Sequence, residues 1–338
     1  MNTSTAPTST SQGRSTRIIG HEAAIAGLYR AICANSIHHT LLFTGPSGIG
    51  KQLVAEALAT TFMCLAHESG EAETTPPFGG CGNCHHCKLA SAGNLPDLIR
   101  VSCGDRSAAS TESVRDLLSS LRLRPFGGSY RFLIFDDAHL LQGAAANALL
   151  KSLEEPRPGT FFVLLTDKPH LMLRTIHSRA QRWGFHQLKE SELADILKRE
   201  GIDIQESLIE LAAGSVASYR LIQGEHTHLK TLNSQLKEIA HGNVAAALKL
   251  GNELSQQKDS FKENITYLHL LARKEMLHTQ ELHWANFLYE LGEFEYYLTK
   301  RNFAPLYLLQ NLFIRLAECS QDQFIVENNR SLSDLIPA

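Results

Sequence analysis

The sequence predicts an α/β domain built on a parallel sheet, followed by an all-helical region. Up to about residue 188, short and almost wholly apolar segments alternate with segments of helical spacing. Strands that are apolar on both faces are typical of parallel sheets covered by helices on both sides. After about residue 188 no strand pattern follows, and Leu, Ile, Tyr and Phe recur at the spacing of helices.

The expected elements follow from these patterns in chain order. We expect strands at His39–Thr44, Asp97–Val101, Arg131–Asp137, Thr160–Thr166 and Arg182–His186. Helices are expected at about 22–34, 52–64, 110–118 and 144–153, and directly after the segment 81–87. Short amphipathic helices are expected at 191–200, 205–213 and 216–223, before a helical pattern that continues from about 231 to 320.

Composition excludes several classes of protein. The 338 residues are 43% hydrophobic and 20% charged, which is ordinary for a globular chain. The net charge of −3 argues against a protein that binds nucleic acid through its overall charge. The absence of an apolar run of membrane-spanning length and of a signal-peptide pattern predicts a cytoplasmic protein without membrane contact. Residues 1–17 are rich in Ser and Thr and are expected to be a disordered tail, with a transit peptide as the alternative.

A phosphate-binding loop is expected at residues 44–52. The pattern of Gly, four residues, Gly and Lys is met by Gly45, Gly50 and Lys51, but Gln52 replaces the usual hydroxyl residue. Backbone N–H groups and the following helix N-terminus would hold the phosphates of ATP or ADP. The candidate nucleotide-binding residues are Gly45, Ser47, Gly48, Gly50, Lys51 and Gln52. Gln52 lacks the hydroxyl that ligates Mg²⁺, and a strand-to-helix turn without ligand remains the alternative.

Two carboxylates follow the third expected strand. Asp136 is placed to hold Mg²⁺, and Asp137 takes the position where a Glu usually polarises the attacking water. Asp137 is one methylene shorter than Glu, so hydrolysis is expected to be impaired. Thr166 ends a later strand and is a further candidate contact to the γ-phosphate or the water. The alternative is a solvated acidic turn after a core strand.

Four cysteines predict a structural zinc site. Cys81, Cys84 and Cys87 carry two successive two-residue gaps, and Cys64 ends the preceding helix. Four thiolates close a tetrahedral site with no open position for catalysis. The zinc module is expected at about residues 62–95. The competing ligands are His67, His85 and His86, and the alternatives are free thiols or a three-cysteine site. The other cysteines, Cys33, Cys103 and Cys319, are expected in the core.

These motifs, together with Asn147–Pro156 and His177-Ser178-Arg179, resemble the bacterial clamp-loader AAA+ proteins of DNA polymerase III, most closely the delta-prime class. The resemblance covers about residues 18–225. It implies Cys64, Cys81, Cys84 and Cys87 as zinc ligands, and Arg179 as an arginine that reaches the ATP of a neighbouring subunit in trans. The alternative for Arg179 is a surface arginine that caps a helix C-terminus.

The resemblance also implies a domain plan and a function. The plan is an AAA+ domain over 18–188, a helical lid over 189–230 and a helical collar for assembly over 231–330. Gln52, Asp137 and Ala217 depart together from the pattern of active motors, and Arg220 lies a turn too late to replace the lid arginine. We therefore expect a subunit with weak or no ATPase, in a hetero-pentamer with gamma/tau and delta subunits.

That pentamer would load the sliding clamp onto primed DNA. Two other functions are alternatives. A gamma/tau-like ATPase motor is the first alternative, and the three altered positions oppose it. A zinc module that binds nucleic acid by itself is the second, and the charge balance and the complete AAA+ scaffold oppose it.

Overall fold

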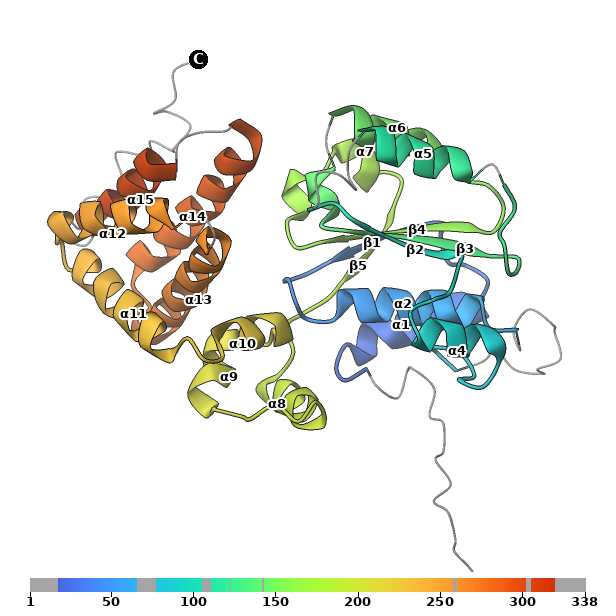
Figure 1. Cartoon of the computed structure of the whole chain (residues 1–338), viewed down its shortest axis with the longest axis horizontal. Coiled ribbons are helices and arrows are strands. Elements are labelled where there is room, and N and C mark those ends of the chain that lie inside the picture. The colour runs from blue at the N-terminus through green and yellow to red at the C-terminus, as the bar shows by residue number, and fades with distance from the viewer. Residues whose placement is uncertain are drawn as a thin grey trace, which may run out of the picture. The chain divides into compact units, whose positions relative to one another are not determined.

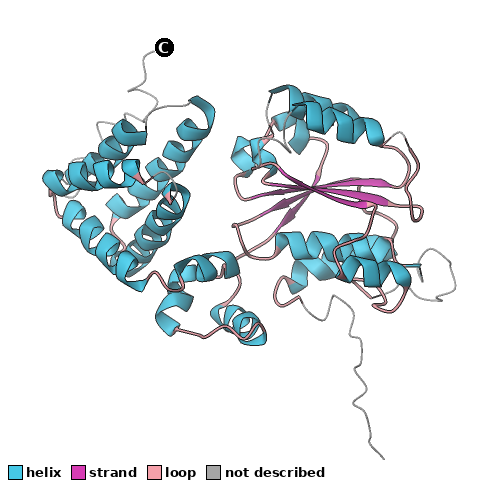
Figure 2. Cartoon of the chain, viewed as in Figure 1, coloured by secondary structure: helices cyan, strands magenta, loops and turns pink. Residues whose placement is uncertain are grey.

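A five-stranded parallel sheet organises the first part of the molecule (Figure 2). The computed structural model describes residues 18–65, 77–104, 111–121, 123–141, 143–257, 260–301 and 305–319. The strands are β1 (Thr40–Thr44), β2 (Leu98–Ser102), β3 (Arg131–Asp136), β4 (Thr160–Thr166) and β5 (Gln181–Gly184). They lie in the order β2-β3-β4-β1-β5, and every neighbouring pair is parallel. The predicted parallel sheet is confirmed.

Helices cover both faces of this sheet (Figure 1). One face carries α1 (Glu22–Cys33), α2 (Lys51–Phe62) and α4 (His85–Ser91). The other face carries α5 (Thr111–Ser120), α6 (Gly143–Glu154) and α7 (Arg174–His177). Short 3₁₀ turns follow two strands, η2 (Ala138–Leu140) after β3 and η3 (Pro169–Leu171) after β4.

The apolar strand pattern has a direct structural reason. In β3, Phe132 and Ile134 pack into the core formed with α1, α2 and α4, whereas Leu133 and Phe135 pack into the core formed with α5 and α6. Successive side chains of a strand point to opposite faces, so a strand buried on both faces must be apolar throughout. The sequence run Arg131–Asp136 meets this requirement.

One strand boundary differs from the sequence prediction in a way that affects the site. The strand expected to include Asp137 ends at Asp136. Asp137 adopts a left-handed conformation, with φ 50° and ψ 44°, and begins the η2 turn. Asp is one of the residues that tolerate this conformation, because its short polar side chain bonds locally. The two carboxylates therefore lie on different local backbones and not on one continuous strand.

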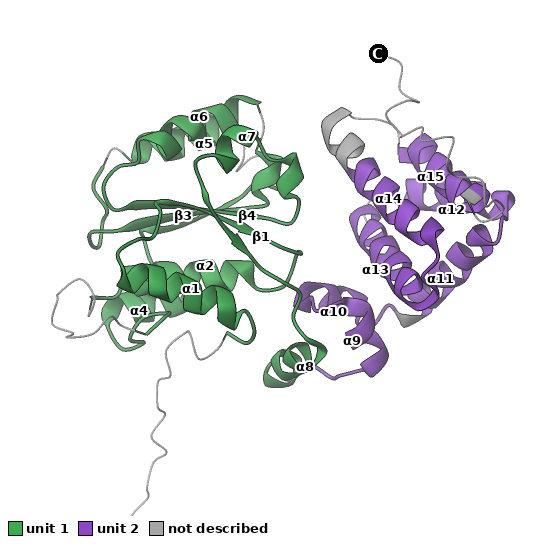
Figure 3. Ribbon diagram, turned by 180° about the vertical axis from the view of Figure 1, so that it is seen from behind, with its two compact units in different colours: residues 1–200 green, residues 201–338 purple. Residues whose placement is uncertain are grey.

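The chain divides into two compact units, residues 1–200 and residues 201–338 (Figure 3). The first unit ends with α8 (Glu190–Arg199). The described part of the second unit is helical throughout. Its helices are α9 (Glu206–Ala212), α10 (Val216–Ile222), α11 (His226–Ala240), α12 (Val244–Gln256), α13 (Phe261–Thr279), α14 (Leu282–Arg301) and α15 (Pro305–Cys319). The expected change from an α/β to an all-helical region is confirmed.

Close packing of α12 and α15 gives the second unit part of its core. Gly251 of α12 faces Gln310 of α15, and a Cβ at Gly251 would lie 2.9 Å from Gln310 Cγ and 3.1 Å from Gln310 N. Only glycine allows the two backbones to approach this closely. Leu250 and Leu254 of α12 are buried beside it. No helix in the described part of the chain is both long and apolar enough to cross a membrane.

Candidate functional site

The predicted phosphate loop connects β1 to α2 and is fixed at its start by backbone contacts. Gly45 N–H donates to Thr166 O over 3.1 Å, and Phe185 N–H donates to Thr44 O over 2.7 Å. A Cβ at Gly45 would lie 2.3 Å from Phe185 O. The first glycine of the loop is therefore required because Phe185, directly after the neighbouring strand β5, comes so close, and this holds without any ligand.

The rest of the loop presents a helix N-terminus. Gly48 and Gly50 have φ of 71° and 102°, and α2 begins at Lys51 without a side-chain cap. Ser47 is exposed at the loop tip. The first N–H groups of a helix have no partner within the helix, and together with the helix dipole they favour an anion. This geometry fits the loop predicted to bind phosphate.

Lys51 is turned onto its own loop. Its Nζ donates to Gly45 O over 2.7 Å and to Pro46 O over 2.5 Å. Burial lowers the pKa of Lys51, and the neighbouring acids Asp167 and Asp136 partly oppose this shift. The ammonium group therefore lies near the carboxylates at the sheet edge while it bonds to loop carbonyls. Contact with a phosphate would replace these bonds.

Gln52, which replaces the hydroxyl residue, is engaged elsewhere. Its Nε2 donates to Glu56 Oε1 over 3.1 Å, and the same oxygen accepts a hydrogen bond of 2.7 Å from Arg100 Nε on β2. The Glu56 side chain is only 6% exposed, and the ion pair with Arg100 stabilises its buried carboxylate. The Gln52 amide thus joins a chain of polar contacts that runs from α2 to β2. The sequence had suggested neither Glu56 nor Arg100.

The carboxylates at the end of β3 form a negatively charged edge. Asp136 is exposed, and its Oδ1 accepts a hydrogen bond from Asp137 N–H. Burial, followed by the charges of Asp136 and Asp167, raises the pKa of Asp137. Burial, followed by the charges of Asp137 and Asp136, raises the pKa of Cys103 to about 12. Burial is the larger cause of both shifts, and the neighbouring carboxylates add to it.

Thr166 and two residues that sequence reasoning missed complete this edge. Thr166 Oγ1 accepts the Lys168 N–H over 3.0 Å and lies 3.2 Å from Nδ1 of the buried His139. That same ring nitrogen lies 3.6 Å from Asp167 Oδ1. Asp167 directly follows the β4 strand, and the signal that could have found it is its place at the carboxyl edge of a parallel sheet.

Arg179 lies just after α7 and contacts its own chain. Its Nη1 donates to Thr175 O over 2.9 Å and to Ser178 Oγ over 3.1 Å. Its Nη2 forms an ion pair with Glu154 at the end of α6. The Arg179 side chain is one-third exposed. The contact to Thr175 O is the helix-capping interaction that the sequence left open as an alternative, and the partially exposed group leaves the trans role as a proposal.

The lid positions named from the sequence lie on α10. Ser215 caps this helix, because its side chain accepts the Ser218 N–H over 3.1 Å. Ala217 and Arg220 are both exposed on the helix. The alanine offers no group to a nucleotide.

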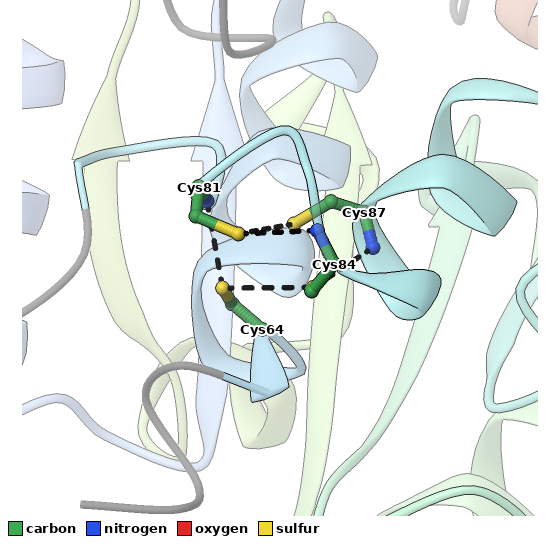
Figure 4. Close-up of side chains that lie close together, drawn as sticks. All are labelled: Cys64, Cys81, Cys84 and Cys87. Carbon is green, nitrogen blue, oxygen red and sulfur yellow. Dashed lines mark hydrogen bonds between the residues drawn. The ribbon is translucent and has the colours of Figure 1, made fainter. Parts of the chain in front are cut away.

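The four cysteines meet at one point (Figure 4). Cys64 Sγ lies 4.0 Å from Cys84 Sγ, and Cys81 Sγ lies 4.0 Å from Cys87 Sγ. All four sulfur atoms lie within 4.8 Å of one another. A tetrahedral zinc with Zn–S bonds of about 2.3 Å needs sulfurs separated by about 3.8 Å. The set could therefore bind a zinc ion with little movement of the side chains.

Backbone N–H groups support these sulfurs. Cys84 N–H donates to Cys81 Sγ, and Cys87 N–H donates to Cys84 Sγ, each over 3.4 Å. Cys81 N–H donates to Cys64 Sγ over the same distance. A Cβ at Gly80 would lie 2.6 Å from Cys87 Sγ, so glycine leaves space for the sulfur. This is the arrangement expected from the double two-residue spacing.

The histidines that were predicted as competing metal ligands differ in where they lie. The Nδ1 of His86 lies 2.8 Å from Met63 O, so this ring is used in a backbone contact. His85 is not part of the group that the described residues form, and His67 lies outside the described residues. Cys64, the least certain of the predicted ligands, is completely buried and joins the group.

Ionisation differs among the sulfurs. Burial opposes ionisation of Cys81, but the N–H groups of Cys84 and Asn83 outweigh it and lower the pKa of Cys81 to about 7. Burial raises the pKa of Cys87. A bound dication would favour the thiolate at all four positions, because metal binding displaces the thiol protons.

The remaining cysteines correct one expectation. Cys103 is buried as predicted, but Cys33 is exposed, so its predicted place in the core is wrong. Cys33 is the last residue of α1, directly after the buried Ile32, so the two side chains lie on different sides of the helix. The side chain of Cys319 lies outside the described residues.

Comparison with known proteins gives related subunits of one enzyme. Two proteins of Haemophilus influenzae match. The DNA polymerase III subunit tau/gamma is 33% identical over 60% of this chain and 29% of its own length. The DNA polymerase III subunit delta' is 35% identical over 52% of this chain and 51% of its own length. Subunit tau of Bacillus subtilis is 28% identical over 72% of this chain and 47% of its own length. The chain thus spans about a third to a half of these relatives.

Among solved structures, a gamma-subunit-related protein of Thermotoga maritima matches with a TM-score of 0.42 and 19% identity, over 88% of this chain and 99% of the other. The sequence model of the family described as "DNA polymerase III, delta subunit" matches residues 20–189, which is half of the chain. That match covers the parallel sheet, the glycine loop, the acidic strand end and the cysteine cluster. The chain therefore belongs to the DNA polymerase III delta subunit family of clamp-loader proteins.

Proposed function

We propose that this chain is a delta-prime-like subunit of a DNA polymerase III clamp loader. It would join gamma/tau and delta subunits in a hetero-pentamer that places the sliding clamp on primed DNA. In that assembly the AAA+ domain (18–188) would hold the site, the lid (189–230) would follow it, and the helical collar (231–330) would bind the neighbouring subunits. Family membership and the match to a delta' subunit support this role.

The observation that carries the proposal is the engagement of Gln52. Where a motor has a hydroxyl for Mg²⁺, this side chain bonds to Glu56, which in turn bonds to Arg100. The loop still offers N–H groups and Lys51 to ATP or ADP. Asp136 would hold Mg²⁺, but Asp137 is shorter than the Glu that would polarise the attacking water. We therefore infer nucleotide binding with weak or absent hydrolysis.

Arg179 would act on the ATP of a neighbour. Its guanidinium group is positioned by Thr175 O, Ser178 Oγ and Glu154, yet it remains partly exposed. These contacts employ three of the five N–H donors that an arginine carries, so donors remain for a phosphate. An arginine supplied in trans stabilises the charge that develops on the γ-phosphate.

The cysteine cluster would hold a structural zinc ion. The four sulfurs close a tetrahedral site, and such sites leave no position for a reacting water. The ion would connect the end of α2 to the start of α4. Its contribution is to folding.

A gamma/tau-like motor is the second candidate, because the tau/gamma relative is aligned over more residues than the delta' relative. The two candidates differ in a direct assay. The zinc-loaded chain alone, its Lys51→Ala variant and a purified gamma/tau subunit are compared for ATP turnover. We expect negligible turnover by this chain. A rate like that of gamma/tau, abolished in Lys51→Ala, would establish the motor.

The clamp-loader role itself is tested by reconstitution. The chain is mixed with gamma/tau and delta subunits, and the product is measured for mass and for loading of labelled clamp onto primed DNA. We expect a stable pentamer whose loading activity requires this chain. Failure to co-assemble would refute the proposal.

A further inference from the structure

Three side chains outside the nucleotide loop meet at the carboxyl edge of the sheet. Asp137 comes from the turn after β3, His139 from the η2 helix and Asp167 from the residue after β4. One ligand atom from each lies within 4.8 Å of the others. The His139 side chain is only 7% exposed, and the two aspartates are half-buried. The topology thus brings an imidazole and two carboxylates from separate segments to one point.

One carboxylate oxygen at this point has no hydrogen-bond partner. Thr166 Oγ1 accepts the Lys168 N–H and lies 3.2 Å from His139 Nδ1. The same imidazole nitrogen lies 3.6 Å from Asp167 Oδ1, which is beyond hydrogen-bond distance. Asp167 Oδ1 is buried and has no hydrogen-bond partner. A buried carboxylate oxygen without a donor costs free energy, which a cation would recover.

The local charge points the same way. Asp136 and Asp137 are adjacent in the chain, and one carboxylate oxygen of Asp167 lies within 4.8 Å of one of Asp137, so three carboxylates gather at this edge. The ammonium group of Lys51 bonds to Gly45 O and Pro46 O. Like charges at close range are tolerated when a cation lies between them.

We propose that Asp137, His139 and Asp167 bind a first-row divalent cation of the Mn²⁺, Co²⁺ or Zn²⁺ class, and that this site fills without nucleotide. The site is separate from a Mg²⁺ ion that arrives with ATP, because it needs no phosphate oxygen and no side chain at position 52. It is also independent of whether the chain is a delta-prime-like or a motor subunit.

The ligand set selects the class of metal. Mn²⁺, Co²⁺ and Zn²⁺ accept an imidazole together with carboxylates, whereas Mg²⁺ prefers oxygen ligands and keeps most of its water. Ligand atoms around an ion with bonds of about 2.1 Å are separated by about 3 to 4 Å. The ligand atoms here, all within 4.8 Å of one another, lie near these separations. Water would supply the remaining ligands.

Mn²⁺ titration of the whole chain tests this site. One equivalent of zinc per chain is added first; it fills the cysteine cluster, because thiolates select zinc over carboxylates, and leaves the second site free. Nucleotide-free protein is then titrated with MnCl₂, and free Mn²⁺ is followed by electron paramagnetic resonance. We expect binding that saturates at one Mn²⁺ per chain. The Lys168 amide, which bonds to Thr166 Oγ1, should be broadened in the NMR spectrum of the loaded protein.

Variants assign the ligands. His139→Gln and Asp167→Asn should each weaken Mn²⁺ binding at least about tenfold, since even residues that only support a ligand change affinity by this factor. His170→Gln, an exposed histidine on η3, is the matched control and should bind like the parent chain. Absence of Mn²⁺ binding, or equal binding by the parent and His139→Gln, would overturn the proposal. Asp167→Asn decides the question if His139→Gln does not fold.

Discussion

The cysteine cluster and the phosphate loop lie in the same unit but differ in how complete they are. The cluster brings all four sulfurs within 4.8 Å, and neighbouring N–H groups support them. The loop has its glycines and Lys51, but Gln52 bonds to Glu56 and not to an ion. A metal site whose ligands all come from one chain can be complete within that chain. A site whose chemistry needs a nucleotide, and by proposal a neighbour, is left open.

The largest expected effect follows from breaking the closed site. Cys84→Ser should remove the zinc and destabilise the first unit by several kcal/mol, because structural zinc contributes about 10 kcal/mol or more to folding in small domains. Metal analysis and thermal unfolding measure both changes. Cys33→Ser, at an exposed cysteine outside the cluster, is the control and should leave both unchanged. Less than about half a zinc per parent chain would refute the site, since a structural site should be nearly filled.

The next effect concerns Arg179, which by proposal acts on the ATP site of a neighbouring subunit. In the reconstituted complex, Arg179→Ala should lower kcat at the ATP site it faces by up to about a thousandfold, because a trans arginine stabilises the developing phosphate charge. Turnover of the whole complex falls less, because other sites still act. Arg174→Ala, at an exposed arginine beginning α7, is the control. ATPase rates unchanged by Arg179→Ala would remove this role.

A smaller effect is expected within the loop itself. Lys51→Ala should weaken binding of a fluorescent ATP analogue by roughly tenfold, as loss of one charged phosphate contact costs about 1.4 kcal/mol or more. Binding by the parent chain should depend little on Mg²⁺, because position 52 has no hydroxyl. Gln52→Thr should introduce such a dependence. Strong Mg²⁺ dependence of the parent would show that the loop is more complete than its contacts suggest.

The smallest effect is a pH dependence in the zinc-free cluster. The pKa of Cys81 is lowered to about 7, so its reactive thiolate should increase as pH rises through about 7 and level off above it. Cys103, with a pKa of about 12, should stay unreactive over this range. Alkylation with iodoacetamide, read by mass spectrometry, measures both. Zinc should suppress the reaction of Cys81, and a half-point near the ordinary pKa of a thiol would contradict this assignment.

Much of the architecture could be predicted because burial leaves a direct pattern in the sequence. Strands such as β4 (Thr160–Thr166) are apolar on both faces, and their expected positions agree closely with the structure. Spacing likewise predicted that Cys81, Cys84 and Cys87 would meet. The end of β3 was predicted one residue too late, because an aspartate fits both a strand end and the left-handed turn that Asp137 adopts.

By itself, the sequence determined the parallel sheet, the helical second region, the glycine loop and the cysteine set. Each depends on local propensity, periodicity or short spacing. Only the tertiary structure decided that Glu56 bonds to Arg100, that Arg179 pairs with Glu154, and that Asp137, His139 and Asp167 meet. These contacts join segments whose separation in the chain carries no pattern, and the order of the strands in the sheet is what brings their ends together.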